Sequence, residues 1–188
     1  MTGIILAGGK STRMGMEKGL VMFKGKPLIR YALDVLIPLC DEILISSNSE
    51  RYRHFGHEII PDEIPGIGPM GGIYSCLKQS KNELNLVLSC DMPFVTPEIF
   101  GHLLSVRNDS TISIPWYEGE HFEPMCGVYH KKAIHIMQEF IMKKNYKLPD
   151  LFKCTSFTAL KIADMVPAPG PHYFFSINSP GDLERFLE

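Results

Sequence analysis

The chain has 188 residues, of which 45% are hydrophobic, so it is long enough to bury the core of one α/β domain and short for two; we expect a single domain over residues 1–188. Its formal net charge of −2 at pH 7 gives no basic excess that would indicate nucleic acid or an anionic membrane as a partner. Because no apolar run approaches the roughly 20 residues that span a bilayer, and the first residues lack the pattern of a secretory signal, we expect a cytoplasmic protein.

The first predicted element is a buried strand over residues 3–7, and a glycine-rich loop follows it up to Lys18. Glycines let backbone N–H groups approach an anion, and the cations Arg13 and Lys18 can neutralise its charge. The loop is therefore predicted to hold phosphate. It is not a Walker A loop, because that motif requires a glycine where this chain has Ile4.

The next elements lead to a polar segment. Residues 20–23 are predicted to be extended, and apolar residues at helical spacing predict a helix that starts near Pro27 and ends close to Pro38. A second strand is predicted over residues 42–46. Three polar residues centred on Asn48 follow it, at the edge where open α/β sheets bind ligands. Asn48 is a candidate ligand contact; the alternative is a helix N-cap or an Asx turn.

A third short strand is predicted over residues 57–61, followed by a second glycine-rich loop over residues 62–72 and a helix over residues 72–79. Three glycines of this loop match the G-x-G-x-x-G pattern formally. The loop lies far from the first strand and contains Pro69, so we do not predict a dinucleotide site there.

The most continuous apolar run, residues 84–89, predicts a central parallel strand. Asp91 follows it, where a carboxylate is well placed to hold a Mg²⁺ ion that bridges nucleotide phosphates; the alternative is a cap of the turn before Pro93. No base partner is identifiable for Cys90, so a thiol nucleophile is not predicted. The five cysteines are widely spaced and form no Cys-x-x-Cys pair, so we expect reduced, mostly buried thiols and no zinc site.

The second half of the chain continues the alternation of strands and helices. We predict a helix capped by Thr96, a strand over residues 111–115, a polar loop over residues 116–124, a strand over residues 125–129, a helix over residues 133–142 and a last helix capped by Ser179. The alternation predicts a three-layer α/β/α fold with a mainly parallel sheet and a site across the carboxyl ends of its strands.

Residues 6–18, Leu-Ala-Gly-Gly-x-Ser-x-Arg-Met-Gly-x-x-Lys, resemble the signature of nucleotidyltransferases related to sugar-nucleotide pyrophosphorylases. The resemblance is closest to the molybdenum cofactor guanylyltransferases, the molybdopterin-guanine dinucleotide synthesis protein A family, and implies their Rossmann-like nucleotide-diphospho-sugar transferase fold. It implies that Arg13 and Lys18 contact the phosphates of a nucleoside triphosphate and that the Gly-Gly pair favours GTP over CTP. The GTP contacts implied in this segment are Leu6, Ala7, Gly8, Gly9 and Lys18.

Two later motifs are similar to elements of the same family. Asp62 with the run Gly68-Pro69-Met70-Gly71 is similar to the element that recognises guanine, which implies contacts from Asp62, Gly68, Pro69 and Gly71. A carboxylate suits guanine because it can accept hydrogen bonds from N1–H and the exocyclic amine. The resemblance further implies that Asn48 lies near the nucleotide and that Asp91 binds the metal.

The second substrate has weaker matches. The cationic run over residues 143–147 is usually a solvated helix end; the resemblance offers Lys147 as a contact of anionic molybdopterin, and Asn178 matches an amide of the family's closing motif. The chain departs from the family pattern at Glu123, for which we predict no role, and at Ser176, which replaces a second amide.

The implied reaction is transfer of GMP from GTP to the terminal phosphate of molybdenum-bound molybdopterin, giving the guanine dinucleotide cofactor and pyrophosphate. A phosphate nucleophile is already ionised, so Arg13, Lys18 and Asp91 with Mg²⁺ would act by positioning and charge stabilisation. Partners implied besides GTP and molybdopterin are molybdenum-insertion proteins and acceptor molybdoenzymes. The alternatives are a cytidylyl or sugar-phosphate nucleotidyltransferase and a nucleotide-binding adaptor without catalysis.

Overall fold

A computed structural model describes residues 1–8, 17–117, 121–161 and 172–186. The strands are β1 (Thr2–Leu6), β2 (Met22–Phe23), β3 (Lys26–Pro27), β4 (Glu42–Ser46), β5 (Glu58–Ile60), β6 (Leu84–Ser89), β7 (Ile112–Tyr117), β8 (His121–Phe122), β9 (Cys126–His130) and β10 (Phe157–Lys161). The α-helices are α1 (Leu28–Leu36), α2 (Pro69–Gln79), α3 (Pro97–Val106), α4 (Ala133–Met142), α5 (Leu148–Phe152) and α6 (Pro180–Arg185). Short 3₁₀ turns are η1 (Lys18–Leu20), η2 (Ile37–Leu39) and η3 (Glu50–Phe55).

One mixed sheet contains most of these strands, in the order β10-β7-β9-β6-β1-β4-β5, with β8 paired to β7. Strands β6, β1, β4 and β5 are mutually parallel, and β9 runs antiparallel to both of its neighbours. From β1 the chain crosses first to β4 and β5 on one side and later to β6 on the other. Such a reversal of strand order is where open α/β sheets bind ligands. The register places Leu6 opposite both Ser46 and Ser89, so the carboxyl ends of β1, β4 and β6 lie level with one another.

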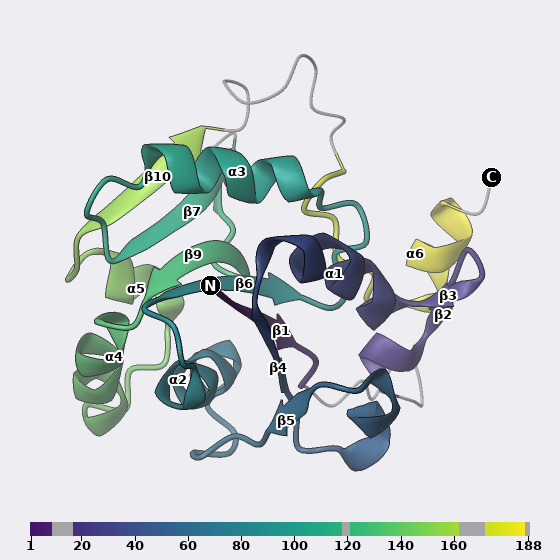
Figure 1. The fold of residues 1–188 in the computed structure, drawn as a ribbon, viewed down its shortest axis with the longest axis horizontal. Coiled ribbons are helices and arrows are strands. Elements are labelled where there is room, and N and C mark those ends of the chain that lie inside the picture. The colour runs from purple at the N-terminus through teal and green to yellow at the C-terminus, as the bar shows by residue number, and fades with distance from the viewer. Residues whose placement is uncertain (9–16, 118–120, 162–171, 187–188) are drawn as a thin grey trace.

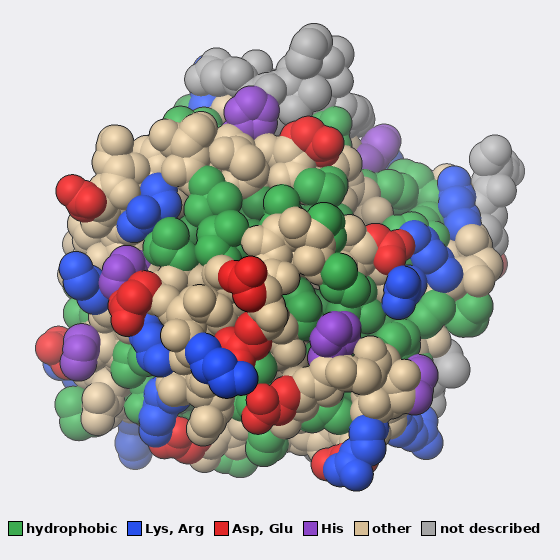
Figure 2. All heavy atoms as spheres, in the orientation of Figure 1, with side chains coloured by type: hydrophobic (Ala, Val, Ile, Leu, Met, Phe, Trp, Pro, Cys, Tyr) green, Lys and Arg blue, Asp and Glu red, His purple; other side chains and the backbone are tan. Residues whose placement is uncertain are grey.

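Helices cover both faces of this sheet, as the three-layer prediction requires. Figure 1 shows α1 and α3 on one face and α2, α4 and α5 on the other. Side chains of β1 alternate accordingly: Ile5 packs in the core with α1 and α3, whereas Ile4 and Leu6 pack in the core with α2, α4 and α5. The face in Figure 2 carries interspersed acidic and basic side chains. No helix in the described segments has both the length and the apolarity needed to cross a bilayer.

Several predicted elements have the predicted bounds, namely the strands over residues 42–46 and 84–89 and the helix over residues 133–142. Thr96 and Ser179 occupy the N-cap positions of α3 and α6, and Ser179 completes a capping box with Asp182. Cys76, Cys90 and Cys126 are buried, which confirms that most of the thiols are buried, and all five cysteines are free.

The predicted start of the second helix is wrong. Helix α2 begins at Pro69, three residues before the predicted residue 72, so Pro69 and Gly71 belong to the helix and not to the loop. Proline suits the first turn because its missing N–H has no intrahelical partner there. The chain turns into the helix at Gly68, whose φ of 69° lies in the region that favours glycine.

Three further corrections concern short elements. Residues 20–23 are not all extended, because Leu20 ends the 3₁₀ turn η1. The predicted loop over residues 116–124 contains β8, and β7 extends into it, with Trp116 opposite Phe122. Helix α5 and strand β10 were not predicted. Helix α5 has five residues, too few for a helical period, and β10 has no buried residue, so it lacks the apolar run that marks the other strands.

Candidate functional site

Three side chains from distant parts of the sequence meet at the carboxyl edge of the sheet: Lys18 of η1, Asp91 after β6, and Asn178 before α6. The Lys18 ammonium donates hydrogen bonds to Asp91 Oδ2 and to Asn178 Oδ1. Ile177 N–H donates to the backbone carbonyl of Asp91 at 2.9 Å, which ties the C-terminal segment to the turn after β6. The structure therefore brings together residues that sequence analysis had assigned to the phosphates, to the metal and to the second substrate.

Asp91 has one carboxylate oxygen free to accept a further partner. Its side chain is only 4% exposed, and Oδ1 is buried without a hydrogen-bond partner among the described residues. A buried carboxylate oxygen without a partner carries a desolvation cost that a bound cation would offset. Within the same residues no three His, Cys, Asp or Glu side chains gather as metal ligands. A Mg²⁺ ion fits here because it commonly takes one carboxylate together with water and substrate phosphates.

Glu123 lies close enough to Asp91 for their charges to interact, and sequence analysis gave it no role. It stands in the turn between β8 and β9, where its N–H donates to Pro115 O at 3.1 Å. Only 8% of Glu123 is exposed, and its Oε1 accepts a hydrogen bond from Met125 N–H at 3.1 Å. Burial is the main cause that raises the pKa of Glu123 to about 7; the hydrogen bond from Met125 N–H opposes the rise, and the Asp91 charge adds to it. The signal in the sequence was the departure from the family pattern at Glu123, directly before Pro124.

Asn48 and Asp62 are in contact on the other side of β1. Asn48 follows β4, and its Oδ1 accepts a hydrogen bond from Asp62 N–H at 2.9 Å. Burial raises the pKa of Asp62, and a hydrogen bond from the Asn48 side chain partly opposes this. The alternative role of Asn48 as a helix cap is wrong, because Ser49 caps η3. The contact holds the start of the second glycine-rich loop against the end of β4.

Helix α2 starts beside the same strand. A Cβ atom added to Gly72 would lie 2.3 Å from Ser46 Oγ, so glycine allows this approach of α2 to β4 and a larger residue would require the Ser46 hydroxyl to move. The predicted base-recognition residues Gly68, Pro69 and Gly71 form the cap and first turn of α2. Pro69 has no N–H, and Gly71 N–H already donates to Gly68 O at 3.0 Å, so this first turn offers few backbone donors to a ligand.

The first glycine-rich loop is described only at its ends. Leu6 O accepts a hydrogen bond from Cys90 N–H at 3.1 Å, and Ala7 N–H donates to Ser46 O at 3.0 Å, so β1 stays paired to its last residue. Gly8 is exposed at the point where the loop begins. The predicted contacts Gly9 and Arg13 lie outside the described residues.

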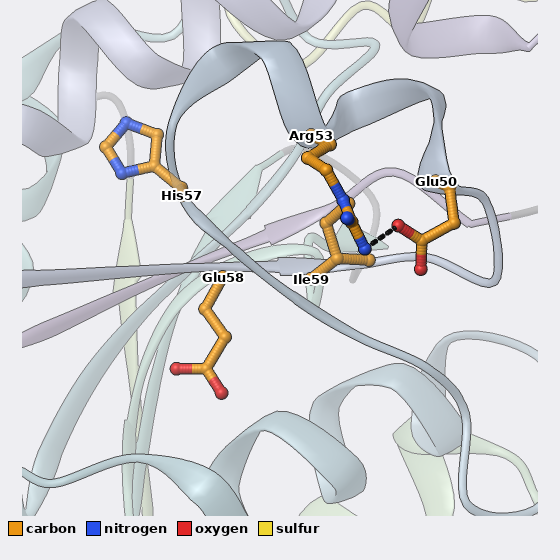
Figure 3. Close-up of a pocket in the computed structure, with 5 residues that line it drawn as sticks. All are labelled: Glu50, Arg53, His57, Glu58 and Ile59. Carbon is orange, nitrogen blue, oxygen red and sulfur yellow. Dashed lines mark ion pairs between the residues drawn. The ribbon is translucent and has the colours of Figure 1, made fainter.

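Two features lie elsewhere. Lys147 is exposed at the N-cap position of α5, and Figure 1 shows α5 on the opposite side of the molecule from α6, so the structure does not bring Lys147 to the cluster of Lys18, Asp91 and Asn178. Its molybdopterin contact stays a prediction. A pocket of about 290 Å³ lies beside the edge strand β5, and its lining residues are drawn in Figure 3. It is lined by Glu50, Arg53, His57, Glu58 and Ile59, and it contains none of the predicted site residues.

Comparison with known proteins finds similarity over most of the chain. Residues 3–157 match the family model described as "MobA-like NTP transferase domain". The chain is 35% identical over 164 residues to a Flavobacterium johnsoniae protein named "Probable molybdenum cofactor guanylyltransferase", covering 87% of this chain and 86% of that one. It is 29% identical over 188 residues to the molybdenum cofactor guanylyltransferase of Vibrio cholerae, covering 97% and 89%.

Among solved structures, the chain is similar to the crystal structure of molybdopterin-guanine dinucleotide biosynthesis protein A from Archaeoglobus fulgidus. The TM-score is 0.82 at 27% sequence identity, and the match covers 98% of this chain and 96% of that one. The similarity therefore extends over both glycine-rich loops and over the C-terminal segment that carries Asn178.

Proposed function

The chain belongs to the family of MobA-like NTP transferase domains, and from this membership we propose that it transfers GMP from GTP to the terminal phosphate of molybdenum-bound molybdopterin. The products are the guanine dinucleotide form of the cofactor and pyrophosphate. The names of its relatives support this choice of nucleotide and acceptor, because they are called molybdenum cofactor guanylyltransferases.

The observation that carries the proposal is the contact of Lys18 with Asp91 and Asn178 at the reversal of strand order. In the proposed reaction, an oxygen of the molybdopterin phosphate forms a bond to the α-phosphorus of GTP. The bond from that phosphorus to the oxygen bridging to the β-phosphate breaks, and pyrophosphate leaves with the electron pair. The Lys18 ammonium stabilises the charge on the phosphates, together with Arg13 of the first loop.

No protein nucleophile is required for this step, because the attacking phosphate is already ionised at neutral pH. Burial raises the pKa of the Cys90 thiol, the one nucleophilic side chain directly beside Asp91 in sequence, so it stays protonated. The protein's part is to align the two phosphates and to hold positive charge where negative charge accumulates.

We further propose that Asp91 holds a Mg²⁺ ion through Oδ1, the buried oxygen that lacks a partner among the described residues. Bound there, the ion would supply positive charge to the nucleotide phosphates. Lys18 occupies the other oxygen of the same carboxylate, so Asp91 can serve both cations at once. Asn178 orients Lys18 from the opposite side.

For the base, we propose that Asp62 accepts hydrogen bonds from guanine. Asn48 holds the backbone of Asp62, and helix α2 begins seven residues later, at Pro69. The burial that raises the pKa of Asp62 also strengthens a hydrogen bond made by its ionised form. Cytosine lacks the adjacent pair of donors that guanine presents.

The test is pyrophosphate release measured with GTP and with CTP, each with and without molybdenum-bound molybdopterin. We expect release only when GTP and molybdopterin are both present, and only with Mg²⁺. Release with CTP in preference to GTP would indicate a cytidylyltransferase instead. Binding of GTP without any release would indicate a nucleotide-binding adaptor.

A further inference from the structure

We propose that Glu17 is a positioning residue, whose carboxylate anchors the 3₁₀ turn η1 to η3 and thereby aims the Lys18 ammonium at Asp91. The inference rests on the proposed function, in which Lys18 stabilises charge on the nucleotide phosphates. Among the described residues, Glu17 contacts neither Asp91 nor Asn178. It directly precedes Lys18, which contacts both.

The anchor is a hydrogen bond between side chains 32 positions apart in sequence. Glu17 Oε1 accepts this bond from Ser49 Oγ, and Glu17 O accepts a bond from Leu20 N–H at 3.0 Å. The first bond attaches the turn to the N-cap of η3, and the second closes the turn itself. Lys18 is the first residue of η1, so its backbone is fixed between these two contacts.

A second contact braces the turn from another side. Tyr52 of η3 is fully buried, and its hydroxyl donates a hydrogen bond to Ala7 O at 3.3 Å. A Cβ atom added to Gly19 would lie 2.9 Å from the same hydroxyl, so η1 packs directly on the tyrosine ring. Tyr52 thus fixes the distance of η1 from the end of β1. Glu17 then limits rotation of the turn about that contact, which sets the direction of the Lys18 side chain.

An ion pair with Arg51 at the surface does not explain the position of Glu17. Arg51 Nε lies 3.9 Å from Glu17 Oε1, and the Arg51 side chain is 68% exposed, so this pair contributes little. Glu17 Oε2 is buried without a hydrogen-bond partner in the described part of the chain, which costs stability. Burial raises the pKa of Tyr52 and the Glu17 carboxylate adds to the rise, so Glu17 also interacts with the tyrosine that braces η1.

The anchor also connects the two halves of the site. Ser49 follows Asn48, whose Oδ1 holds the backbone of Asp62. Two adjacent residues at the end of β4 therefore position the phosphate-side lysine and the base-side carboxylate. A change in the anchor is expected to act on turnover through Lys18.

The test compares Glu17→Ala with Glu17→Gln by steady-state pyrophosphate release. Removing the acceptor lets Lys18 shift, and a displacement of about 1 Å can lower turnover roughly 100-fold, so we expect Glu17→Ala to lower kcat by roughly 10- to 100-fold and to change the KM for GTP much less. Glutamine keeps an amide oxygen that accepts from Ser49, so Glu17→Gln is expected to retain most of the activity. Ser49→Ala should reproduce the loss, and Arg51→Ala serves as the matched control that should not.

Each result bears on the inference. Equal losses in Glu17→Gln and Glu17→Ala would show that the charge acts directly and would overturn a positioning role. Wild-type kcat in Glu17→Ala would overturn it too, as would a loss explained by a fall in melting temperature. Under single-turnover conditions with excess enzyme, adding Glu17→Ala to Lys18→Ala should cause no further loss, because Glu17 acts through Lys18.

A structural measurement separates this inference from the proposed function. If the wild-type chain releases no pyrophosphate with GTP and molybdopterin, the proposed function fails, and a crystal structure of Glu17→Ala still decides the inference. We expect Lys18 Nζ to have left Asp91 in that structure. An unchanged contact between Lys18 and Asp91 would refute the anchor.

Discussion

Replacing Glu123 by glutamine should change how the stability of the chain depends on pH. Burial raises the pKa of Glu123 from its ordinary 4.5 to about 7, so the folded chain favours the protonated carboxyl. A group whose pKa is higher in the folded state contributes stability that is full below pH 4.5 and is lost as the pH rises through about 7. At about 1.4 kcal/mol for each pH unit between the two pKa values, the loss is about 3 kcal/mol.

Glutamine is neutral at every pH, so Glu123→Gln should escape this loss. The assay is urea unfolding of wild type and Glu123→Gln between pH 5 and pH 8. The buffer contains EDTA, because a cation bound at Asp91 would offset the repulsion between the Asp91 and Glu123 carboxylates. Other titrating groups are the same in both proteins and cancel in the difference. Between pH 5 and pH 8, the free energy of unfolding of the variant should rise relative to that of wild type by about 2 to 3 kcal/mol, which is most of the expected loss. Glu139→Gln, on the exposed side of α4, is the control and should follow wild type.

The reasoning would be refuted by a stability difference between Glu123→Gln and wild type that stays constant from pH 5 to pH 8. A variant that becomes less stable than wild type at pH 8 would refute it as well, because that result requires the ionised carboxylate to be favoured by the fold. A small loss of stability at pH 5 that accompanies the expected gain at higher pH would measure the hydrogen bond from Met125 N–H.

Asp91→Asn should abolish pyrophosphate release while the melting temperature stays within a few degrees, because it keeps the shape of the side chain and removes the charge of a carboxylate whose Oδ1 has no hydrogen-bond partner among the described residues; full activity would exclude Asp91 from the mechanism. Gly72→Ala should cost about 1–3 kcal/mol in urea unfolding, because its Cβ would meet Ser46 Oγ at 2.3 Å. In helix α3, a Cβ atom added to Gly101 meets nothing within 4 Å, so Gly101→Ala should stabilise the chain by about 0.5–1 kcal/mol. Equal effects of Gly72→Ala and Gly101→Ala would contradict the packing argument. Asp62→Asn should raise the KM for GTP roughly 10- to 100-fold with less effect on kcat, because an amide donor would face the donors of guanine; an unchanged KM would exclude Asp62 from base recognition.

Local hydrophobic patterns were sufficient for the long elements of the fold. The strands over residues 42–46 and 84–89 and helix α4 have their predicted bounds because each buries a run or a stripe of apolar residues that can be recognised without its partners. Helix α5, β8 and β10 could not be predicted in this way. Phe122 of β8, Phe152 of α5 and Phe157 of β10 pack on one another, so each short element is stabilised by the other two and not by its own pattern.

The sequence by itself determined which residue types the site contains, because Lys18, Asp91 and Asn178 each belong to a motif that can be recognised locally. Only the tertiary structure decided how they interact. The Lys18 ammonium contacts partners 73 and 160 residues away, and those contacts depend on the level carboxyl ends of β1 and β6. The buried Oδ1 of Asp91, which has no hydrogen-bond partner in the described part of the chain, the burial of Glu123 and the anchor at Glu17 arise from the same packing. Charge and burial at a site depend on which neighbours surround it in space, and a chain written in order does not contain that information explicitly.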